Sequence, residues 1–270
     1  MTRKQWIAAS LLIICSFVSN AQVKTGIEVL RERKFDILQG KRVGLCTNPT
    51  GVDRNLVSTI DILWESKDVN LVALYGPEHG VRGNIYAGDH VENEVDKRTG
   101  LKMYSLYGKT SKPTPEMMDE VDILVYDIQD IGCRSYTYIS TMGNLMEACQ
   151  EYGKELVVLD RPNPLGGQKI EGCLVEDGFY SFVSRFAIPY IYGQTPGELA
   201  LYLNAKADKP CKLTVVEMEG WTRDMTWDEI GMDCSITTRA SRTNCHLLSR
   251  DRYLWRVLLY QYWCGLYYAF

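Results

Sequence analysis

Residues that could carry out acid–base chemistry follow four short apolar runs of this 270-residue chain. Thr47-Asn48-Pro49-Thr50-Gly51 follows the first run, and Gly76-Pro77-Glu78-His79-Gly80, with Arg82 close behind, follows the second. Residues 127–138 follow the third, and Asp160-Arg161-Pro162-Asn163-Pro164 follows the fourth. A positioned carboxyl group can donate or accept a proton in a transition state. The loops therefore predict a site that acts on a polar substrate.

Four carboxylates are candidates for this chemistry: Glu78, Asp127, Asp130 and Asp160. Glu78 lies between Gly, Pro and His and has no evident capping or solvating role, so we predict that it is the catalytic acid/base. His79 and Arg82 are close enough along the chain to tune its protonation. The residues expected to bind substrate lie in the same loops: Asn48, His79, Arg82, Asp127, Asp130, Arg134, Tyr136, Tyr138, Asp160, Arg161 and Asn163.

Each of these loops also has a purely structural interpretation. Gly-Pro and Asn-Pro form turns, and an Asp at the end of a strand commonly caps the next helix. Tyr136 and Tyr138 would point to the same side of an extended strand and form a wall for stacking on a sugar, or they could belong to the core. Arg134 and Arg161 could hold a carboxylate through paired hydrogen bonds. Four such loops at one edge favour a site.

The elements that position these loops alternate along the chain. Short β-branched runs predict strands at Arg42–Cys46, Asn70–Tyr75, Asp122–Asp127, Glu155–Asp160 and Leu213–Glu217. Helical stretches lie between them at Gly26–Leu38, Leu56–Glu65, Ile139–Tyr152 and Pro196–Ala207. Strands that alternate with helices of this length predict an α/β fold with a mostly parallel sheet covered on both faces. We expect a Rossmann-like, doubly wound domain over residues 22–230, in which ligands bind at the carboxyl ends of the strands.

Composition and missing motifs exclude several classes of function. The net charge of −4 offers no basic surface for nucleic acid. No GxGxxG, GxxxxGK[ST] or GxSxG motif is present, which disfavours dinucleotide sites, nucleoside triphosphate sites and the nucleophile elbow of hydrolases. With three histidines, we predict no metal and no other cofactor. A metal-dependent hydrolase built on His79, Asp127 and Asp130 is a weaker alternative, and no protein partner is inferred.

The first 21 residues have the pattern of a secretory signal peptide. Arg3 and Lys4 precede an apolar run from Trp6 to Val18, which is shorter than the roughly 20 residues that span a membrane. No later stretch is long and apolar enough to span, so we expect an exported protein, periplasmic or extracellular after cleavage. Eight cysteines follow residue 21 without a CxxC motif, and we expect buried free thiols.

The four loops carry a family resemblance. Residues 43–51, 76–83, 127–138 and 160–164 resemble an exported bacterial family, formerly of unknown function, whose studied members are exo-β-N-acetylmuramidases of the NamZ type. The resemblance extends from about Gly26 to Trp227. It implies a Rossmann-like catalytic domain, a smaller C-terminal domain, and removal of N-acetylmuramic acid from the non-reducing end of peptidoglycan fragments. It places the catalytic carboxylate at Glu78, and the lactyl carboxylate of the substrate would suit Arg134 or Arg161.

The last 40 residues depart from this resemblance. Residues 231–270 contain no Lys, Glu or Pro and lack the Pro-Ser-Pro and Gly-Val-Gly-Tyr-Thr segments of relatives. Codons can be chosen for Asp233–Arg239 and for Gln261–Phe270 whose shifted frame encodes both segments. We therefore expect an out-of-frame tail without an evolved fold, so that the family's second domain is missing or corrupted. A high-accuracy read of the DNA would test this hypothesis.

Two questions stay open at the level of the sequence. Glycosidases usually pair two carboxylates about 5 Å apart when retaining and about 6.5–9.5 Å apart when inverting. Asp127, Asp160 or the acetamido group of the substrate could be the partner of Glu78. The chain could also be a non-catalytic, exported saccharide-binding domain or a decayed enzyme, because its second domain is not recognisable.

Overall fold

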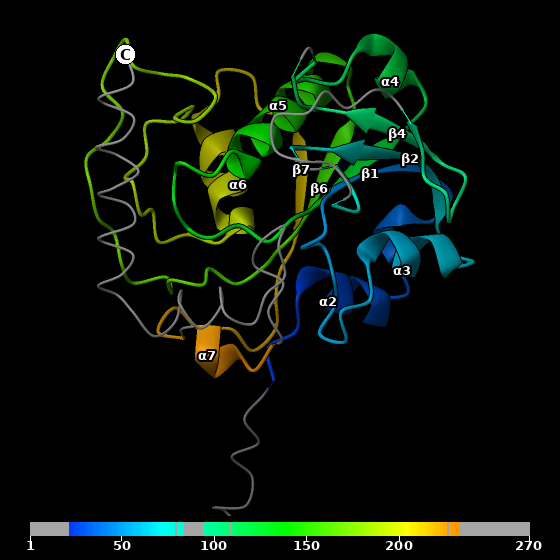
Figure 1. Cartoon of the computed structure of the whole chain (residues 1–270), viewed down its shortest axis with the longest axis horizontal. Coiled ribbons are helices and arrows are strands. Elements are labelled where there is room, and N and C mark those ends of the chain that lie inside the picture. Colours follow the sequence, from blue (N-terminus) through cyan, green and yellow to red (C-terminus); the bar gives the residue numbers. More distant parts are fainter. Residues whose placement is uncertain (1–21, 79, 84–93, 109, 226, 233–270) are drawn as a thin grey trace, which may run out of the picture.

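A seven-stranded sheet with helices on both faces forms the centre of the protein, which we describe from a computed structural model (Figure 1). The structure describes residues 22–78, 80–83, 94–108, 110–225 and 227–232. The predicted signal peptide, His79 and nearly all of the predicted out-of-frame tail lie outside these residues. No described helix is long and apolar enough to cross a membrane.

The strands have the order β3-β4-β2-β1-β5-β6-β7 across the sheet. Their bounds are Arg42–Thr47 for β1, Asn70–Gly76 for β2, Glu94–Val95 for β3, Lys102–Ser105 for β4, Ile123–Asp127 for β5, Glu155–Leu159 for β6 and Lys212–Val216 for β7. Every pair is parallel except β3 with β4. This order confirms the predicted Rossmann-like fold, and all five predicted strands are present to within a residue or two.

The helices cover both faces of the sheet (Figure 1). One face carries α2 at Gly26–Glu32, the 3-10 turn η1 at Asp36–Leu38 and α3 at Thr59–Glu65. The other carries α4 at Pro115–Asp119, α5 at Tyr138–Glu151 and α6 at Pro196–Lys206. A short helix, α7 at Trp227–Ile230, packs in a separate cluster with Val23 and Ile131.

Alternation along the central strands builds the two core layers. In β5, Leu124 and Tyr126 face the α5 side, whereas Ile123 and Val125 face the α2 side. All four side chains are fully buried. A strand buried on both faces needs apolar residues at every position, which explains why these strands were recognisable as continuous apolar runs.

Backbone conformation explains where the predicted helix bounds were wrong. Residues 26–38 do not form one helix, because Lys34 and Phe35 adopt left-handed backbone angles (φ 54° and 53°) after α2 ends. Leu56 is also left-handed (φ 59°), so α3 begins only after Ser58, whose side chain accepts a hydrogen bond from the Ile60 amide. At the start of α6, Thr195 and Glu198 form a capping box, and the helix begins at Pro196 as predicted.

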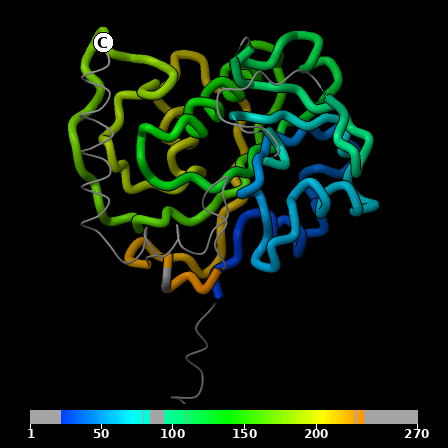
Figure 2. The backbone as a smooth tube through the Cα atoms, viewed as in Figure 1, coloured from blue at the N-terminus to red at the C-terminus, as the bar shows by residue number. Residues whose placement is uncertain are grey.

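A long segment without helices or strands joins β6 to α6. Residues 160–195 run as an irregular path beside the sheet, at the left of Figure 2. Arg134 holds this path, since its Nη1 donates to the carbonyls of Cys173 and Ile188 at 2.8 and 2.5 Å. The segment exposes several large apolar side chains: Ile170, Leu174, Phe179, Tyr180 and Val183.

The ends of the described domain lie next to each other. Lys24 and Glu219 form an antiparallel bridge with backbone hydrogen bonds of 2.9 and 3.1 Å. The amide of Gly26 donates to the carbonyl of Asp160 at 2.8 Å. A Cβ on Gly26 would come within 2.5 Å of the Asp160 nitrogen, so glycine allows the start of α2 to rest directly on the end of β6.

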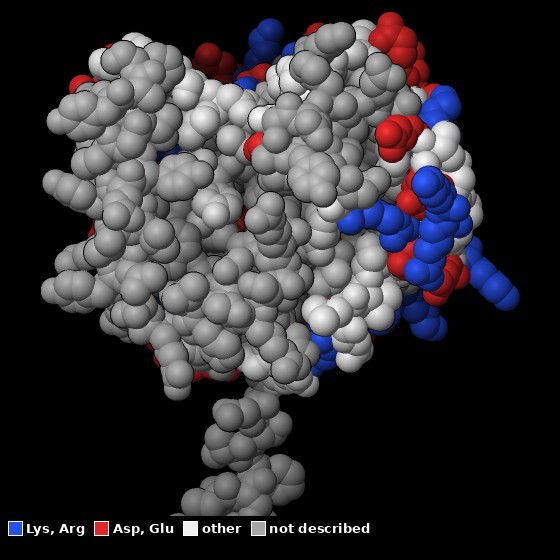
Figure 3. All heavy atoms as spheres, viewed as in Figure 1, with Lys and Arg blue, Asp and Glu red and all other residues white. Residues whose placement is uncertain are grey.

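The cysteines and the surface charges complete the fold. Cys46, Cys133, Cys149 and Cys211 are buried free thiols, as predicted, whereas Cys173 is free but exposed. The other predicted thiols lie outside the described residues. On the face seen in Figure 3, described acidic and basic side chains intermingle over the α3 side, where Arg98 bridges Asp61 and Glu65.

Candidate active site

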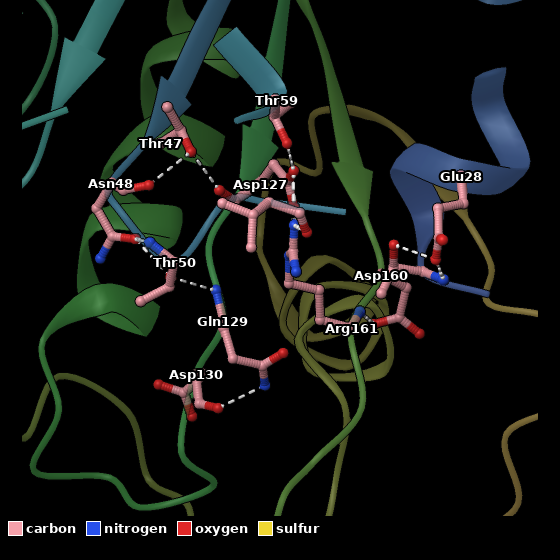
Figure 4. A network of polar contacts seen from close by, with 12 residues as sticks. Glu28, Thr47, Asn48, Thr50, Thr59, Asp127, Gln129, Asp130, Asp160 and Arg161 are labelled. Carbon is pink, nitrogen blue, oxygen red and sulfur yellow. Dashed lines mark hydrogen bonds and ion pairs between the residues drawn. The ribbon is translucent and has the colours of Figure 1, made fainter. Parts of the chain in front are cut away.

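The polar loops meet at the point in the sheet where two neighbouring strands lead to helices on opposite faces. After β1 the chain passes to α3 on one face, and after β5 it passes to α5 on the other. Because β1 and β5 are neighbours, their carboxyl ends diverge and leave room between the two loops. This switch point is where ligands bind in open α/β sheets. Figure 4 shows the side chains that gather there.

A buried ion pair links the ends of β5 and β6. Arg161 Nε and Nη2 donate to the two carboxylate oxygens of Asp127 at 2.5 and 2.9 Å (Figure 4), and neither side chain is exposed. Thr59 Oγ1 donates to Asp127 as well, and Arg161 Nη2 also donates to the Val52 carbonyl. The carboxylate that Arg161 holds in this structure is therefore that of Asp127.

Short hydrogen bonds connect the loops after β1 and β5. Thr47 Oγ1 donates to the Asp127 carbonyl at 2.7 Å. Asn48 Oδ1 accepts from the amide of Thr50 at 2.9 Å, and Thr50 Oγ1 accepts from the amide of Gln129 at 2.9 Å. Gly51 leaves no space for a side chain, because a Cβ there would come within 2.0 Å of Thr47 Oγ1. The two loops form one rigid unit.

This unit contains polar atoms that have no partner within the described chain. Among the described residues, five buried side-chain nitrogen or oxygen atoms lack a hydrogen bond. Three of them belong to these loops, Asn48 Nδ2, Gln129 Oε1 and Asp130 Oδ1, and a fourth, Arg161 Nη1, lies in the loop after β6. Buried polar atoms are normally satisfied, and unsatisfied ones at a strand edge are typical of a site built to hold a polar ligand.

Glu78 lies at the adjacent strand end, after β2, and is half-buried. Its turn is closed by a hydrogen bond from the Gly80 amide to the Pro77 carbonyl at 3.0 Å. Burial raises the pKa of the Tyr107 hydroxyl, and the charge of Glu78 and a hydrogen bond with it add to this shift. Burial also raises the pKa of Tyr138, with the Glu78 charge contributing, while the Asn48 amide acts in the opposite direction. The charge of Glu78 therefore acts on the hydroxyl groups of both Tyr107 and Tyr138.

Asp130 and Asp160 are buried carboxyls with a different environment from that of Asp127. Burial raises the pKa of each to about 6. Asp130 accepts hydrogen bonds from the Tyr192 hydroxyl and from the Gly132 amide. Asp160 accepts from Thr195 Oγ1 at 2.9 Å and from the Gly197 amide at 2.7 Å, so it caps the start of α6.

We expect Asp160→Asn to stabilise the protein at neutral pH. The pKa of about 6 in the folded state exceeds the ordinary 3.8. The stability contributed by the protonated carboxyl is therefore present below about pH 4 and lost as the pH rises through about 6. Asparagine caps a helix as well as aspartate does and has no charge to bury. Urea unfolding from pH 4 to 8 should show the variant's advantage shrinking towards acid; an advantage independent of pH would contradict this account.

The predicted sugar-stacking wall is wrong in its geometry. Residues 133–137 form a bridge and turns, not an extended strand, and Tyr138 is the first residue of α5. The rings of Tyr136 and Tyr138 consequently meet edge to face, with centroids 6.4 Å apart and planes at 66°. Tyr138 is buried in the core, and Tyr136 is half-buried between two apolar clusters.

Three other predicted residues anchor loops in this structure. Arg82 binds Asp96 and Asp61 at 2.6 and 2.9 Å, and these partners raise its pKa despite its partial burial. Arg134 holds the irregular segment and lies over the Tyr190 ring. Asn163 Nδ2 donates to the Gln194 carbonyl at 2.9 Å. Contact of any of them with substrate stays a prediction.

The sequence analysis missed several members of the site: Thr47, Thr50, Thr59, Tyr107, Gln129 and Tyr192. Thr50 and Gln129 lie inside the quoted loops and were passed over because neither can transfer a proton. Thr59 and Tyr192 are remote in sequence from their partners, and only the fold shows them. In the part of the chain that the structure describes, no three His, Cys, Asp or Glu side chains could hold a metal ion.

The chain is similar to a characterised enzyme and to proteins of known structure. The peptidoglycan beta-N-acetylmuramidase NamZ of Bacillus subtilis (strain 168) is 52% identical over 208 residues, which are 77% of this chain and 50% of that protein. Crystal structures of two DUF1343 family proteins from Bacteroides fragilis are also similar. The first is 63% identical with a TM-score of 0.75, over 79% of this chain and 54% of that one. The second is 36% identical with a TM-score of 0.67, over 77% and 55%.

The chain thus spans about half the length of these relatives. The family described as exo-beta-N-acetylmuramidase NamZ, N-terminal, matches residues 43–238, a range that includes all four polar loops. The chain therefore belongs to the family of the NamZ N-terminal region.

Proposed function

We propose that this chain is the Rossmann-like catalytic part of an exo-acting glycosidase that releases N-acetylmuramic acid from the non-reducing end of peptidoglycan fragments. The observation that carries the proposal is the half-buried carboxylate of Glu78 beside the switch point. The 52% identity to a peptidoglycan beta-N-acetylmuramidase supports it. The cellular role would be the turnover and recycling of the cell wall.

Glu78 is the group that would transfer the proton. Its charge acts on Tyr107 and Tyr138, and among the described residues it forms no ion pair of the kind that holds Asp127. As general acid it would protonate the glycosidic oxygen as the bond breaks, and as general base it would then activate water. The polar atoms without partners in the loops after β1 and β5 supply donors and acceptors for hydroxyl and amide groups of a sugar.

The acetamido group of the substrate is the second catalytic partner that the geometry favours. Both oxygens of Asp127 are taken by Arg161 and Thr59, and both oxygens of Asp160 by the start of α6. A carboxylate held in this way is a poor nucleophile. Attack of the acetamido oxygen on the anomeric carbon would form a cyclic intermediate and expel the leaving group, which Glu78 protonates; water then opens the ring with overall retention.

A matched pair of substrates tests this proposal. We expect the chain to hydrolyse a 4-nitrophenyl β-glycoside of N-acetylmuramic acid, and the N-trifluoroacetyl analogue to react more slowly because its carbonyl oxygen is less nucleophilic. The measurement is kcat/KM for both glycosides. If neither glycoside is hydrolysed, the proposal that the chain is a glycosidase is refuted. Equal rates would mean that a carboxylate, and not the acetamido group, is the second catalytic partner.

A non-catalytic saccharide-binding domain is the second candidate. It is favoured by one observation, that Arg161, Thr59 and the start of α6 already hold the carboxylates of Asp127 and Asp160. Calorimetric binding of a muramic acid disaccharide without release of product over days would support binding alone. A predicted contact of the lactyl carboxylate with Arg134 or Arg161 would then be tested by the affinity for the same sugar without the lactyl group.

We also propose that the protein is exported and acts in the periplasm or outside the cell. The basic and apolar pattern of residues 1–21 supports this location. The mature protein would begin at Gln22. Sequencing of the N-terminus from the periplasmic and culture fractions tests the proposal, and an intact Met1 in the cytoplasmic fraction would refute it.

A further inference from the structure

The register of the sheet places Tyr107 beside Glu78. Strands β2 and β4 are parallel neighbours, and their last paired residues are Gly76 and Ser105. The ladder continues one step further, because the Leu106 amide donates to the Gly76 carbonyl at 2.8 Å. Glu78 and Tyr107 each lie two residues beyond the last pair. Residues at equal distances past a parallel pair emerge at the same edge of a sheet.

The backbone on both sides is held in place. Ser105 is buried, its Oγ accepts a hydrogen bond from the Tyr107 amide at 3.3 Å, and the same hydroxyl lies 3.2 Å from the Tyr107 carbonyl. On the opposite strand, the turn from Pro77 to Gly80 fixes the backbone of Glu78. Two short, braced loops thus present one hydroxyl and one carboxylate to each other.

The pKa of Tyr107 determines which member of the pair donates the hydrogen bond. Burial, the charge of Glu78 and the hydrogen bond between them all raise the pKa of Tyr107. The phenol therefore keeps its proton across the pH range in which a glycosidase works, and it can act only as a donor towards an ionised carboxylate. A donor on one carboxylate oxygen leaves the other oxygen free to face a substrate.

We propose that Tyr107 is a positioning residue whose hydroxyl donates to one oxygen of Glu78 and thereby aims the other at the glycosidic bond. This role rests on the proposed function in so far as Glu78 is the acid/base. Tyr107 acts through Glu78 and needs no contact with substrate. Loss of its hydroxyl would let the carboxylate rotate out of line while leaving the sugar-binding loops after β1 and β5 in place.

Two variants three residues apart, one in β4 and one just after it, test the proposal. Tyr107→Phe should lower kcat for a muramic acid disaccharide, whose leaving group needs the proton, roughly 10- to 100-fold, the loss typical of a hydrogen bond to a charged group, while KM changes less than about twofold. Tyr104→Phe is the matched control, because the Tyr104 hydroxyl donates to Glu120 at 2.8 Å instead, and it should keep the wild-type kcat. An unchanged kcat in Tyr107→Phe would overturn the proposal.

A titration of the 270-residue chain labelled with 13Cζ-tyrosine separates this inference from the proposed function. The Tyr107 resonance is assigned by its loss in Tyr107→Phe, and its pKa should fall in Glu78→Gln, where the negative charge is gone. A Tyr107 pKa that does not respond to Glu78→Gln would overturn the pairing even if the chain is an active glycosidase. A chain without activity but with a responsive Tyr107 would refute the proposed function and retain the pairing.

Discussion

Glu78→Gln is expected to lower kcat for hydrolysis of a muramic acid disaccharide roughly 100- to 10,000-fold, the range associated with loss of a general acid/base. The amide has nearly the shape of the carboxylate and cannot transfer the proton. Glu78 is half-buried at a strand end and lies outside the two main apolar clusters, so the thermal stability should change little. Initial rates at saturating substrate, together with a melting curve, measure both.

The leaving group distinguishes loss of proton donation from a general loss of the site. A 2,4-dinitrophenolate leaving group departs from its glycoside without protonation. Glu78→Gln should therefore impair the first step far less with this glycoside than with the disaccharide. Glu94→Gln, on the exposed edge strand β3, is the control and should retain wild-type rates with both substrates. Equal losses with the two leaving groups would remove Glu78 from the role of acid.

Arg161→Met is expected to destabilise the protein by about 3–5 kcal/mol, because breaking a buried ion pair leaves an uncompensated charge. Both Arg161 and Asp127 are fully buried, and the methionine keeps most of the volume. Adding Asp127→Asn should recover part of the loss, since a neutral amide needs no counter-charge. Urea unfolding of the single and double variants measures the change in the free energy of unfolding.

A matched control lies at the amino-terminal ends of the central strands of the same sheet. Arg42, the first residue of β1, and Asp122, the residue before β5, also form a paired Arg–Asp contact, at 2.7 Å. Their side chains are 45% and 41% exposed, and exposed pairs contribute little to stability. Arg42→Met should therefore leave the unfolding midpoint nearly unchanged. A loss as large as that of Arg161→Met would mean that burial is not what makes the inner pair important.

Most of the sheet could be predicted because its central strands are buried on both faces. The runs around Leu124 and Val157 consist of apolar residues that only a doubly covered parallel strand requires. The edge is different: β3 has two residues, both exposed, and β4 has four, of which only Ser105 is buried. Such short strands carry no period, and only the pairing of β4 with β2 and of β3 with β4 defines them.

The loops of the site could be predicted, but the partners within them could not. A strand end rich in Asn, Asp and Arg indicates a polar edge, and these side chains do gather there. Whether Arg161 faces a ligand or Asp127 depends on the register of β5 against β6. Likewise, the turn after Gly132 removes Tyr136 and Tyr138 from the extended geometry that their spacing suggested. Contacts between residues far apart in the sequence decide such pairings, and a local sequence pattern does not reveal these contacts.

The antiparallel bridge between Lys24 and Glu219 has a consequence for synthesis. A ribosome produces residue 24 long before residue 219, so the first turn of α2 has no docking partner on that side until β7 and the residues after it have been made. Lys24 therefore lacks the partner of this bridge through most of translation, although Gly26 can already dock on Asp160. Ribosomes stalled within residues 196–206 should display the segment around Lys24 to added protease, and those stalled well beyond residue 232 should protect it.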